Sequence, residues 1–233
     1  MWEFLDKIIY INLDEREDRR KIMNRFFMLG QIPLEKTQRF SAIKHEIGAI
    51  GASQSHIAVL KLAKINGWKN VLILEDDVEW IDSKYDEIER LMKTEWDVFM
   101  LGGTYIEKQD LKVKIAYSGY SYIVREHYYD ALVQNLEEGL YFKLNKKGSG
   151  PTSLIKQMNY KYLVRKDTFH SFDSYWMRLQ WKDNWIGISA CKHKHTYSDV
   201  SKSDNYQDIE VTVGTHEFKG FIEGLKFWLE DNK

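Results

Sequence analysis

Three consecutive carboxylates, Glu75, Asp76 and Asp77, follow the apolar run 71–74 in the stretch NVLILEDDVEW. The run has the length and branching of a buried strand, whereas three like charges at its end repel one another and resist burial. Alternate side chains of a strand share a face, so Glu75 and Asp77 would point one way and Asp76 the other. Such oxygen ligands suit a hard divalent cation, Mn²⁺ or Mg²⁺, which would relieve the repulsion. The alternative is a strand end with solvated acids.

The stretch GAIGASQSH, residues 48–56, could hold a phosphate. Its glycines predict a loop, and Ser53 is a good N-cap for a helix that Gly67 would end. The free N–H groups of such a helix start attract phosphate, and Ser55 and His56 would add donors from the first turn. The alternative is an ordinary capped helix after a flexible loop.

Three arginines, Arg16, Arg19 and Arg20, come directly after an apolar stretch at residues 7–14. Arginine binds phosphates and stacks on planar bases. The alternative is a helix surface on which the arginines pair with neighbouring acids. A metal site, a phosphate-binding helix start and these arginines together describe a pocket for a nucleoside diphosphate.

The elements that must position these residues follow from the hydrophobic periodicity. The first half alternates strands and helices, which predicts an α/β fold with a mostly parallel sheet. Ligands of such sheets sit beyond the carboxyl ends of the strands, and all three expected strands end there in polar or small residues. The expected strands span 7–14, 70–77 and 96–103, and the expected helices span 15–30, 53–67 and 83–93.

The second half, from about residue 106, is less regular. It predicts a strand and a helix within 118–138, a loop at 142–157, a helix from 171 and a strand at 184–191. With no linker or repeat visible, we expect one domain over 1–233, with a donor half at about 1–105. The segment 216–230 predicts an amphipathic helix packed on the domain, and a peripheral membrane contact is the minority interpretation.

Composition sets the broad class. The 233 residues carry 34 Lys and Arg against 35 Asp and Glu, a formal net charge of −1, which argues against a nucleic-acid partner. The single cysteine, Cys191, excludes an internal disulfide and suits a reducing compartment. We see neither a signal peptide nor an apolar run of about 20 residues, so we expect a cytoplasmic protein without a transmembrane segment.

Three segments, IYINLDEREDRR, GAIGASQSH and VLILEDDVEW, resemble in order and spacing the N-terminal motifs of glycosyltransferase family 25. The later SGYSYIVREHYYDALV, FDSYWMRLQ and YSDV resemble its second-half segments more loosely, so the resemblance covers about residues 7–200. It implies the GT-A fold, a nucleotide-sugar donor that is typically UDP-galactose, and Mn²⁺. Members of that family act on lipopolysaccharide or on procollagen hydroxylysine.

On the donor side, the resemblance implies that Asp77 is the main metal ligand, with Glu75 a further ligand or near the donor ribose. Asp76 would also lie near that ribose. The remaining donor residues implied are Asn12, Leu13 and Arg19 around the uracil and ribose, and Ser55 and His56 near the diphosphate or sugar.

On the acceptor side, the resemblance places Asp173 as a general base or acceptor-binding carboxylate. The simpler alternative is that Asp173 caps a helix beginning at Ser174. Asp199 would close the site from the C-terminal side and is the second candidate for the base. The family often has a glutamine before its Ser-Asp motif, where this chain reads CKHKHTY, so His195 could replace it as a metal contact. The alternative is that His193 and His195 belong to a solvated strand edge.

The function expected is therefore a metal-dependent, inverting glycosyltransferase that moves a hexose, galactose or glucose, from a UDP-sugar to a hydroxyl of a glycan, lipopolysaccharide or hydroxylysine. One alternative is a metal-dependent phosphohydrolase, which should carry more metal ligands at other strand ends. The other is a non-catalytic member of the same fold that binds glycans or protein partners.

Overall fold

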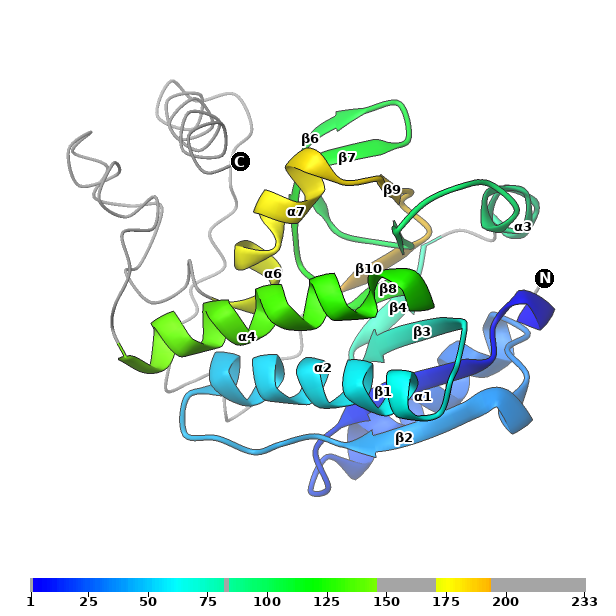
Figure 1. The fold of residues 1–233 in the computed structure, drawn as a ribbon. Coiled ribbons are helices and arrows are strands. Elements are labelled where there is room, and N and C mark those ends of the chain that lie inside the picture. The colour runs from blue at the N-terminus through cyan, green and yellow to red at the C-terminus, as the bar shows by residue number, and fades with distance from the viewer. Residues whose placement is uncertain (1, 82–83, 146–170, 194–233) are drawn as a thin grey trace.

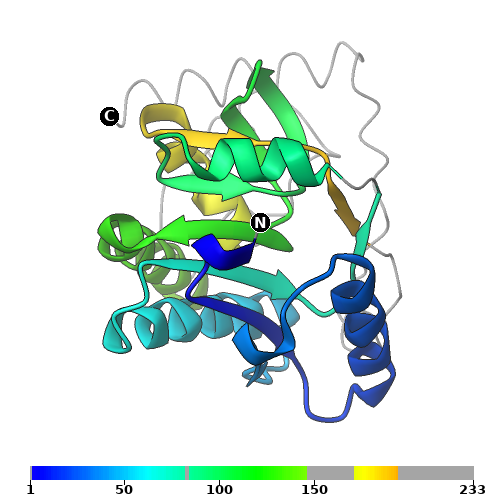
Figure 2. The ribbon, with the colours of Figure 1, turned by 90° about the vertical axis from the view of Figure 1, so that its right-hand side faces the viewer.

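The structure is a computed structural model, and it describes residues 2–81, 84–145 and 171–193. Its centre is an eight-stranded sheet in the order β2-β1-β3-β8-β5-β9-β7-β6, with helices on both faces (Figures 1 and 2). The expected α/β class is confirmed. A second sheet pairs two short strands, β4 and β10.

The strands of the large sheet are β1 Lys7–Asn12, β2 Thr37–Ser41, β3 Asn70–Glu75, β5 Val98–Met100, β6 Thr104–Gln109, β7 Lys112–Tyr117, β8 Ser121–Arg125 and β9 Trp185–Gly187. The small sheet pairs β4 Val78–Trp80 with β10 Cys191–His193. The helices are α1 Glu17–Leu29, α2 Gly48–Ile65, α3 Tyr85–Met92, α4 Tyr129–Asn145, α6 Phe172–Tyr175 and α7 Met177–Lys182. Three 3-10 turns are η1 Trp2–Phe4, η2 Leu34–Lys36 and η3 Glu126–Tyr128.

The strand directions bring the polar strand ends to one edge. β1 runs parallel to β2 and β3, and β5 runs parallel to β9. β8 lies between β3 and β5 and is antiparallel to both, so β3 and β5 point the same way. The carboxyl ends of β1, β3 and β5 therefore share an edge, as the sequence predicted.

Each face of the sheet has its own core. Val71 and Ile73 of β3 pack with residues of α2, α4, α6 and α7. Leu72 and Leu74 of the same strand pack on the other face with residues of α1 and α3. All four side chains are fully buried, as expected for an apolar run in a central strand covered on both faces.

The sequence did not predict β2, β4, β6, β7 or β10. β2 and β6 lie at the edges of the large sheet, and their residues are half-buried or exposed. They carry mixed polar sequences without a clean alternation, so the periodicity that marks buried strands is missing. β4 and β10 are each three residues long, and their pairing is antiparallel between distant parts of the chain.

The start of α2 corrects one prediction. The helix begins at Gly48, so the two glycines lie inside its first turns and do not form a loop before Ser53. Ser53 donates its hydroxyl to the Ala49 carbonyl within the helix instead of capping it. A Cβ on Gly51 would come within 2.4 Å of the Ile43 carbonyl oxygen, so this glycine permits close packing of the preceding loop. The predicted phosphate loop is therefore wrong.

Two further predictions fall outside the described residues: the amphipathic helix at 216–230 and most of the loop at 142–157. Residues 142–145 of that loop belong instead to the end of α4. Among the described helices, none combines the length and apolar character needed to cross a membrane.

Candidate functional site

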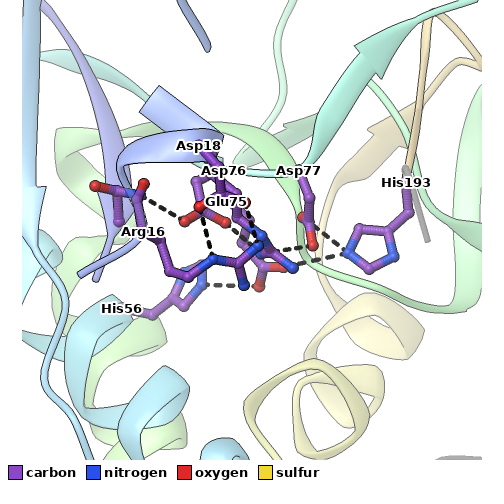
Figure 3. A network of polar contacts seen from close by, with 9 residues as sticks. Arg16, Asp18, His56, Glu75, Asp76, Asp77 and His193 are labelled. Carbon is purple, nitrogen blue, oxygen red and sulfur yellow. Dashed lines mark hydrogen bonds and ion pairs between the residues drawn. The ribbon is translucent and has the colours of Figure 1, made fainter. Parts of the chain in front are cut away.

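The acidic end of β3 meets a histidine from β10. Glu75, Asp77 and His193 each offer one ligand atom, and these atoms lie within 4.8 Å of one another (Figure 3). His193 Nε2 is 2.9 Å from Asp77 Oδ1 and 3.8 Å from Glu75 Oε2. Glu75 and Asp77 share this cluster as expected, but β3 ends at Glu75, so Asp76 and Asp77 lie in the turn before β4 and not in the strand.

The small sheet explains how His193 reaches the acids. β10 pairs with β4 in a register that sets His193 opposite Val78, the residue next to Asp77. The imidazole also stacks on the Tyr120 ring, with centroids 5.4 Å apart. Two chain segments far apart in sequence thus supply one cluster.

The charges in the cluster favour a protonated His193 beside ionised carboxylates. Burial opposes the charge on His193, but Asp77 and Glu75 outweigh that effect and raise the His193 pKa to about 9. Burial likewise disfavours an ionised Asp77, yet the hydrogen bond and charge of His193 and the charge of Arg19 hold the Asp77 pKa below its usual value. Positive groups therefore compensate the acids that the sequence placed at the strand end.

Asp76 is held by Asn12 of β1 and by Arg19 of α1. Its Oδ2 accepts a 2.7 Å hydrogen bond from the Asn12 amide, and its Oδ1 accepts one from Arg19. Arg19 also lies 2.9 Å from Asp77 Oδ2, so one guanidinium bridges both aspartates. Burial raises the Asp76 pKa despite the opposing effect of Arg19. Arg19 and Asn12 therefore hold the two acids in place.

The other residues expected around the nucleotide lie at the same edge. Leu13 sits in the turn after β1, where its carbonyl accepts a hydrogen bond from the Arg16 backbone. Arg16 pairs with Asp18, and Arg20 pairs with Glu17 on the surface of α1. These two arginines thus match the alternative of a salt-bridged helix surface.

Ser55 and His56 are buried inside the protein. The Ser55 hydroxyl accepts from the Ile43 backbone N–H at 2.8 Å and donates to the Gly51 carbonyl at 2.7 Å. Its neighbour His56 contacts Tyr122 through Nδ1 and Glu75 through Nε2. Neither side chain lies in the first turn of its helix.

Asp173 approaches the cluster from α6. Its Oδ2 accepts a 3.0 Å hydrogen bond from the Ser118 backbone N–H. Burial raises the Asp173 pKa, the Ser118 hydrogen bond opposes the rise, and the charge of Glu75 adds to it. The N-cap of α6 is Ser171, so Asp173 is inside the helix and the alternative of a cap before Ser174 is wrong.

His195 and Asp199 lie outside the described residues. His193, which the sequence indicated only as part of a solvated strand edge, is the histidine of the described residues that lies beside the acids. The two histidines are two positions apart and would share a strand face, so the local pattern alone does not choose between them. The pairing of β10 with β4 places His193 beside the acids.

The cluster fits a divalent cation. Two carboxylates and one imidazole are a donor set that Mn²⁺ accepts readily, and binding would displace the proton that His193 carries beside the acids. Asp77 Oδ1 is buried, and apart from its contact with His193 it accepts no hydrogen bond of good geometry from the described residues. A buried carboxylate oxygen of this kind is what a metal ion would satisfy.

No protein-family profile matches this sequence, and no curated protein matches it. Solved structures of similar shape include a protein from STIV, at 14% identity and a TM-score of 0.46, covering 82% of this chain and 86% of that one. A glycosyltransferase involved in the glycosylation of the major capsid of PBCV-1 has 7% identity and a TM-score of 0.44, covering 85% and 96%. 4-Diphosphocytidyl-2C-methyl-D-erythritol synthase from Anaerococcus prevotii has 11% identity and a TM-score of 0.37, covering 86% and 78%. TM-scores below 0.5 establish neither a family nor an activity for this chain.

Proposed function

We propose that this protein is a metal-dependent glycosyltransferase that moves a hexose from a UDP-sugar to a hydroxyl acceptor. The observation that carries the proposal is the meeting of Glu75, Asp77 and His193 at the carboxyl edge of the central strands. That edge is where α/β sheets bind ligands. The resemblance of the surrounding motifs to glycosyltransferase family 25 supports the choice of a nucleotide-sugar donor.

In this proposal Asp77, Glu75 and His193 hold Mn²⁺, with His193 taking the place first expected for His195. The metal would neutralise the diphosphate that leaves during transfer. Asp76 stays bound to Asn12 and Arg19 and keeps the strand end in position.

The donor nucleotide would lie along the carboxyl ends of β1 and β3, bordered by Asn12, Leu13 and Arg19. Arg39 of β2 extends this edge, because its guanidinium donates to the Asn12 carbonyl at 3.2 Å and pairs with Asp14. Ser55 is not part of the donor site, since its hydroxyl is buried and hydrogen-bonded within the protein.

Asp173 is the proposed general base. Its carboxylate would take the proton of the acceptor hydroxyl as the hydroxyl oxygen attacks the anomeric carbon. The bond between that carbon and the diphosphate oxygen breaks in the same displacement, so UDP leaves and the anomeric configuration inverts. Asp199 is the second candidate for this role. A glycan, a lipopolysaccharide sugar and hydroxylysine are the acceptor classes to test.

The test is incubation with a panel of UDP-sugars and Mn²⁺, with UDP release and sugar transfer measured separately. We expect one UDP-hexose to be consumed only with metal, and faster when a hydroxyl acceptor is present. Release of inorganic phosphate without use of any UDP-sugar would identify a phosphohydrolase instead. Binding of glycans without turnover of any donor would identify a non-catalytic member.

A further inference from the structure

We propose that His56 is a positioning residue for the metal centre: it holds Glu75 by one carboxylate oxygen, so that the other oxygen faces Asp77 and His193. This inference rests on the proposed metal-dependent function. It gives His56 a role different from the contact with the diphosphate or donor sugar that the family resemblance implies.

The two oxygens of Glu75 have different neighbours. His56 Nε2 lies 3.4 Å from Oε1, whereas His193 Nε2 lies 3.8 Å from Oε2 (Figure 3). His56 therefore contacts Oε1 of Glu75, while Oε2 lies on the side of Asp77 and His193. A ligand held in this way has lost rotamer freedom before the metal arrives.

The contact with Glu75 selects which His56 nitrogen carries a proton, because a carboxylate oxygen without a proton can only accept. His56 Nδ1 lies 2.9 Å from the Tyr122 hydroxyl, which can either donate or accept. With the proton of a neutral His56 on Nε2, facing Glu75, the Tyr122 hydroxyl donates to Nδ1. If His56 is charged, both nitrogens carry protons and Nε2 again donates to Glu75. Either state of the imidazole presents an N–H to the carboxylate.

Packing fixes the plane of the His56 ring. Phe172 stacks on it with centroids 4.0 Å apart and an angle of 22° between the planes. The His56 side chain is only 1% exposed, so the protein itself covers the ring. Direct recognition of a solvent-borne nucleotide sugar by His56 would require this packing to open.

The same arrangement joins the two halves of the site. Phe172, which stacks on His56, is the residue before Asp173 in α6. Tyr122 of β8 lies opposite Ile73 of β3, and Ile73 is two residues before Glu75. His56 therefore contacts the strand that carries the metal ligand and the helix that carries the proposed base.

The test compares two substitutions that each keep a hydrogen-bonding group near the position of one imidazole nitrogen. In His56→Gln the side-chain amide nitrogen can occupy the place of Nε2 and still donate to Glu75. In His56→Asn the shorter amide can reach Tyr122 but not Glu75. The measurement is the Kd for Mn²⁺ by isothermal titration calorimetry on the full chain, after circular dichroism has confirmed the fold.

We expect His56→Asn to weaken Mn²⁺ binding by about 10- to 100-fold, the usual effect of losing a group that orients a metal ligand. His56→Gln should stay close to the wild type. Equal Mn²⁺ affinity of the wild type and His56→Asn would overturn the inference while leaving the metal site intact. Absence of Mn²⁺ binding in the wild type would refute the proposed metal centre itself.

A second variant keeps the test decisive if His56→Asn does not fold. Tyr122→Phe removes only the hydroxyl that fixes the imidazole, so Mn²⁺ affinity should fall by roughly 2- to 10-fold, the worth of one hydrogen bond. The matched control is Tyr129→Phe, which removes a buried hydroxyl that donates to the Trp68 carbonyl. Equal Mn²⁺ affinity of these two variants would contradict the positioning role.

Discussion

Asp77 carries more of the proposed metal chemistry than any other single residue. Its Oδ1 lies 2.9 Å from His193 Nε2, and its Oδ2 lies 2.9 Å from Arg19. Asp77→Asn replaces a charged ligand by a neutral one of the same shape. We expect it to abolish Mn²⁺-dependent turnover and Mn²⁺ binding while the protein stays folded, because Asp76 still pairs with Arg19. Donor turnover and calorimetry would measure both effects.

The matched control for Asp77→Asn is Asp130→Asn, at an exposed carboxylate that pairs with Lys64. Asp130 comes shortly after the end of β8, where Arg125 lies opposite Asn70, the first residue of β3. It is therefore near the amino end of β3, away from the acids at the carboxyl end. The control should keep full activity. Full turnover by Asp77→Asn, or wild-type turnover unchanged by EDTA, would remove the metal from the mechanism.

The proposed ligand role of His193 can be tested against His195. His193→Ala should raise the Kd for Mn²⁺ by at least about tenfold, because a lost ligand should cost at least as much as a lost supporting contact. His195→Ala, the companion variant from the same segment, should bind Mn²⁺ nearly as the wild type does. Calorimetric titration of both variants checks the assignment, and the reverse order of effects would return the ligand role to His195.

Asp173 is the residue on which the proposed proton transfer depends. Asp173→Asn keeps an oxygen that can accept the Ser118 N–H but removes the proton acceptor. Sugar transfer should fall by roughly 10²- to 10⁴-fold, the typical contribution of a general base. The Kd values for UDP and Mn²⁺ should hardly change. Near-normal transfer would eliminate Asp173 and make Asp199 the next residue to test.

At the scale of elements, the placement of α2 decides where His56 and Ser55 lie. Gly51→Ala would improve intrinsic helix propensity by about 1 kcal/mol. It would also force a Cβ to within 2.4 Å of the Ile43 carbonyl oxygen, a backbone atom that cannot easily move. We expect the clash to prevail and to destabilise the protein by about 1–3 kcal/mol, measured by urea denaturation.

Gly67 provides the control for the Gly51 substitution. It follows the same helix, has a φ of +65° and has no atoms within 4 Å of an added Cβ. Asn tolerates this left-handed conformation, so Gly67→Asn should leave the free energy of unfolding nearly unchanged. A stable Gly51→Ala would mean that the loop at Ile43 can move away from α2.

At the scale of the whole molecule, donor binding should stabilise the fold. A ligand that binds only the native state at 100 times its Kd adds about 2.7 kcal/mol. For a chain of this length, that corresponds to a rise of roughly 5–10 °C in Tm. We therefore expect UDP with Mn²⁺ to raise the Tm by this order, measured by differential scanning fluorimetry.

The same melting experiment contains its own controls. UDP in EDTA should shift the Tm much less, because the diphosphate then lacks its counter-charge. ADP and CDP with Mn²⁺ should shift it less than UDP if the base is recognised. A Tm that no nucleoside diphosphate raises, even at millimolar concentration, would show that the edge of the sheet is not a nucleotide site.

The sequence by itself determined β1, β3, β5, α1 and α3 of the first half, and the acidic strand end. Apolar runs of strand length, such as 71–74, can be buried only between two layers, so their pattern alone indicates a covered sheet. The gathering of polar strand ends follows from the shared direction of β1, β3 and β5. The grouping of Glu75 with Asp77 was also predicted, although Asp76 and Asp77 lie in the turn after β3 and not in the strand.

Only the tertiary structure decided which groups meet those acids. Arg19 contacts both Asp76 and Asp77, although it is 57 residues or more away from them in the sequence. His193 reaches Asp77 through the pairing of two three-residue strands. Short strands carry too little periodicity to be recognised, and the register of a long-range pair depends on packing that a local pattern does not contain. For the same reason GAIGASQSH was misinterpreted: its glycines indicated a loop, whereas Gly51 serves a close contact with Ile43. The polar partners of His56 were likewise fixed only when α2 was packed against β3 and β8.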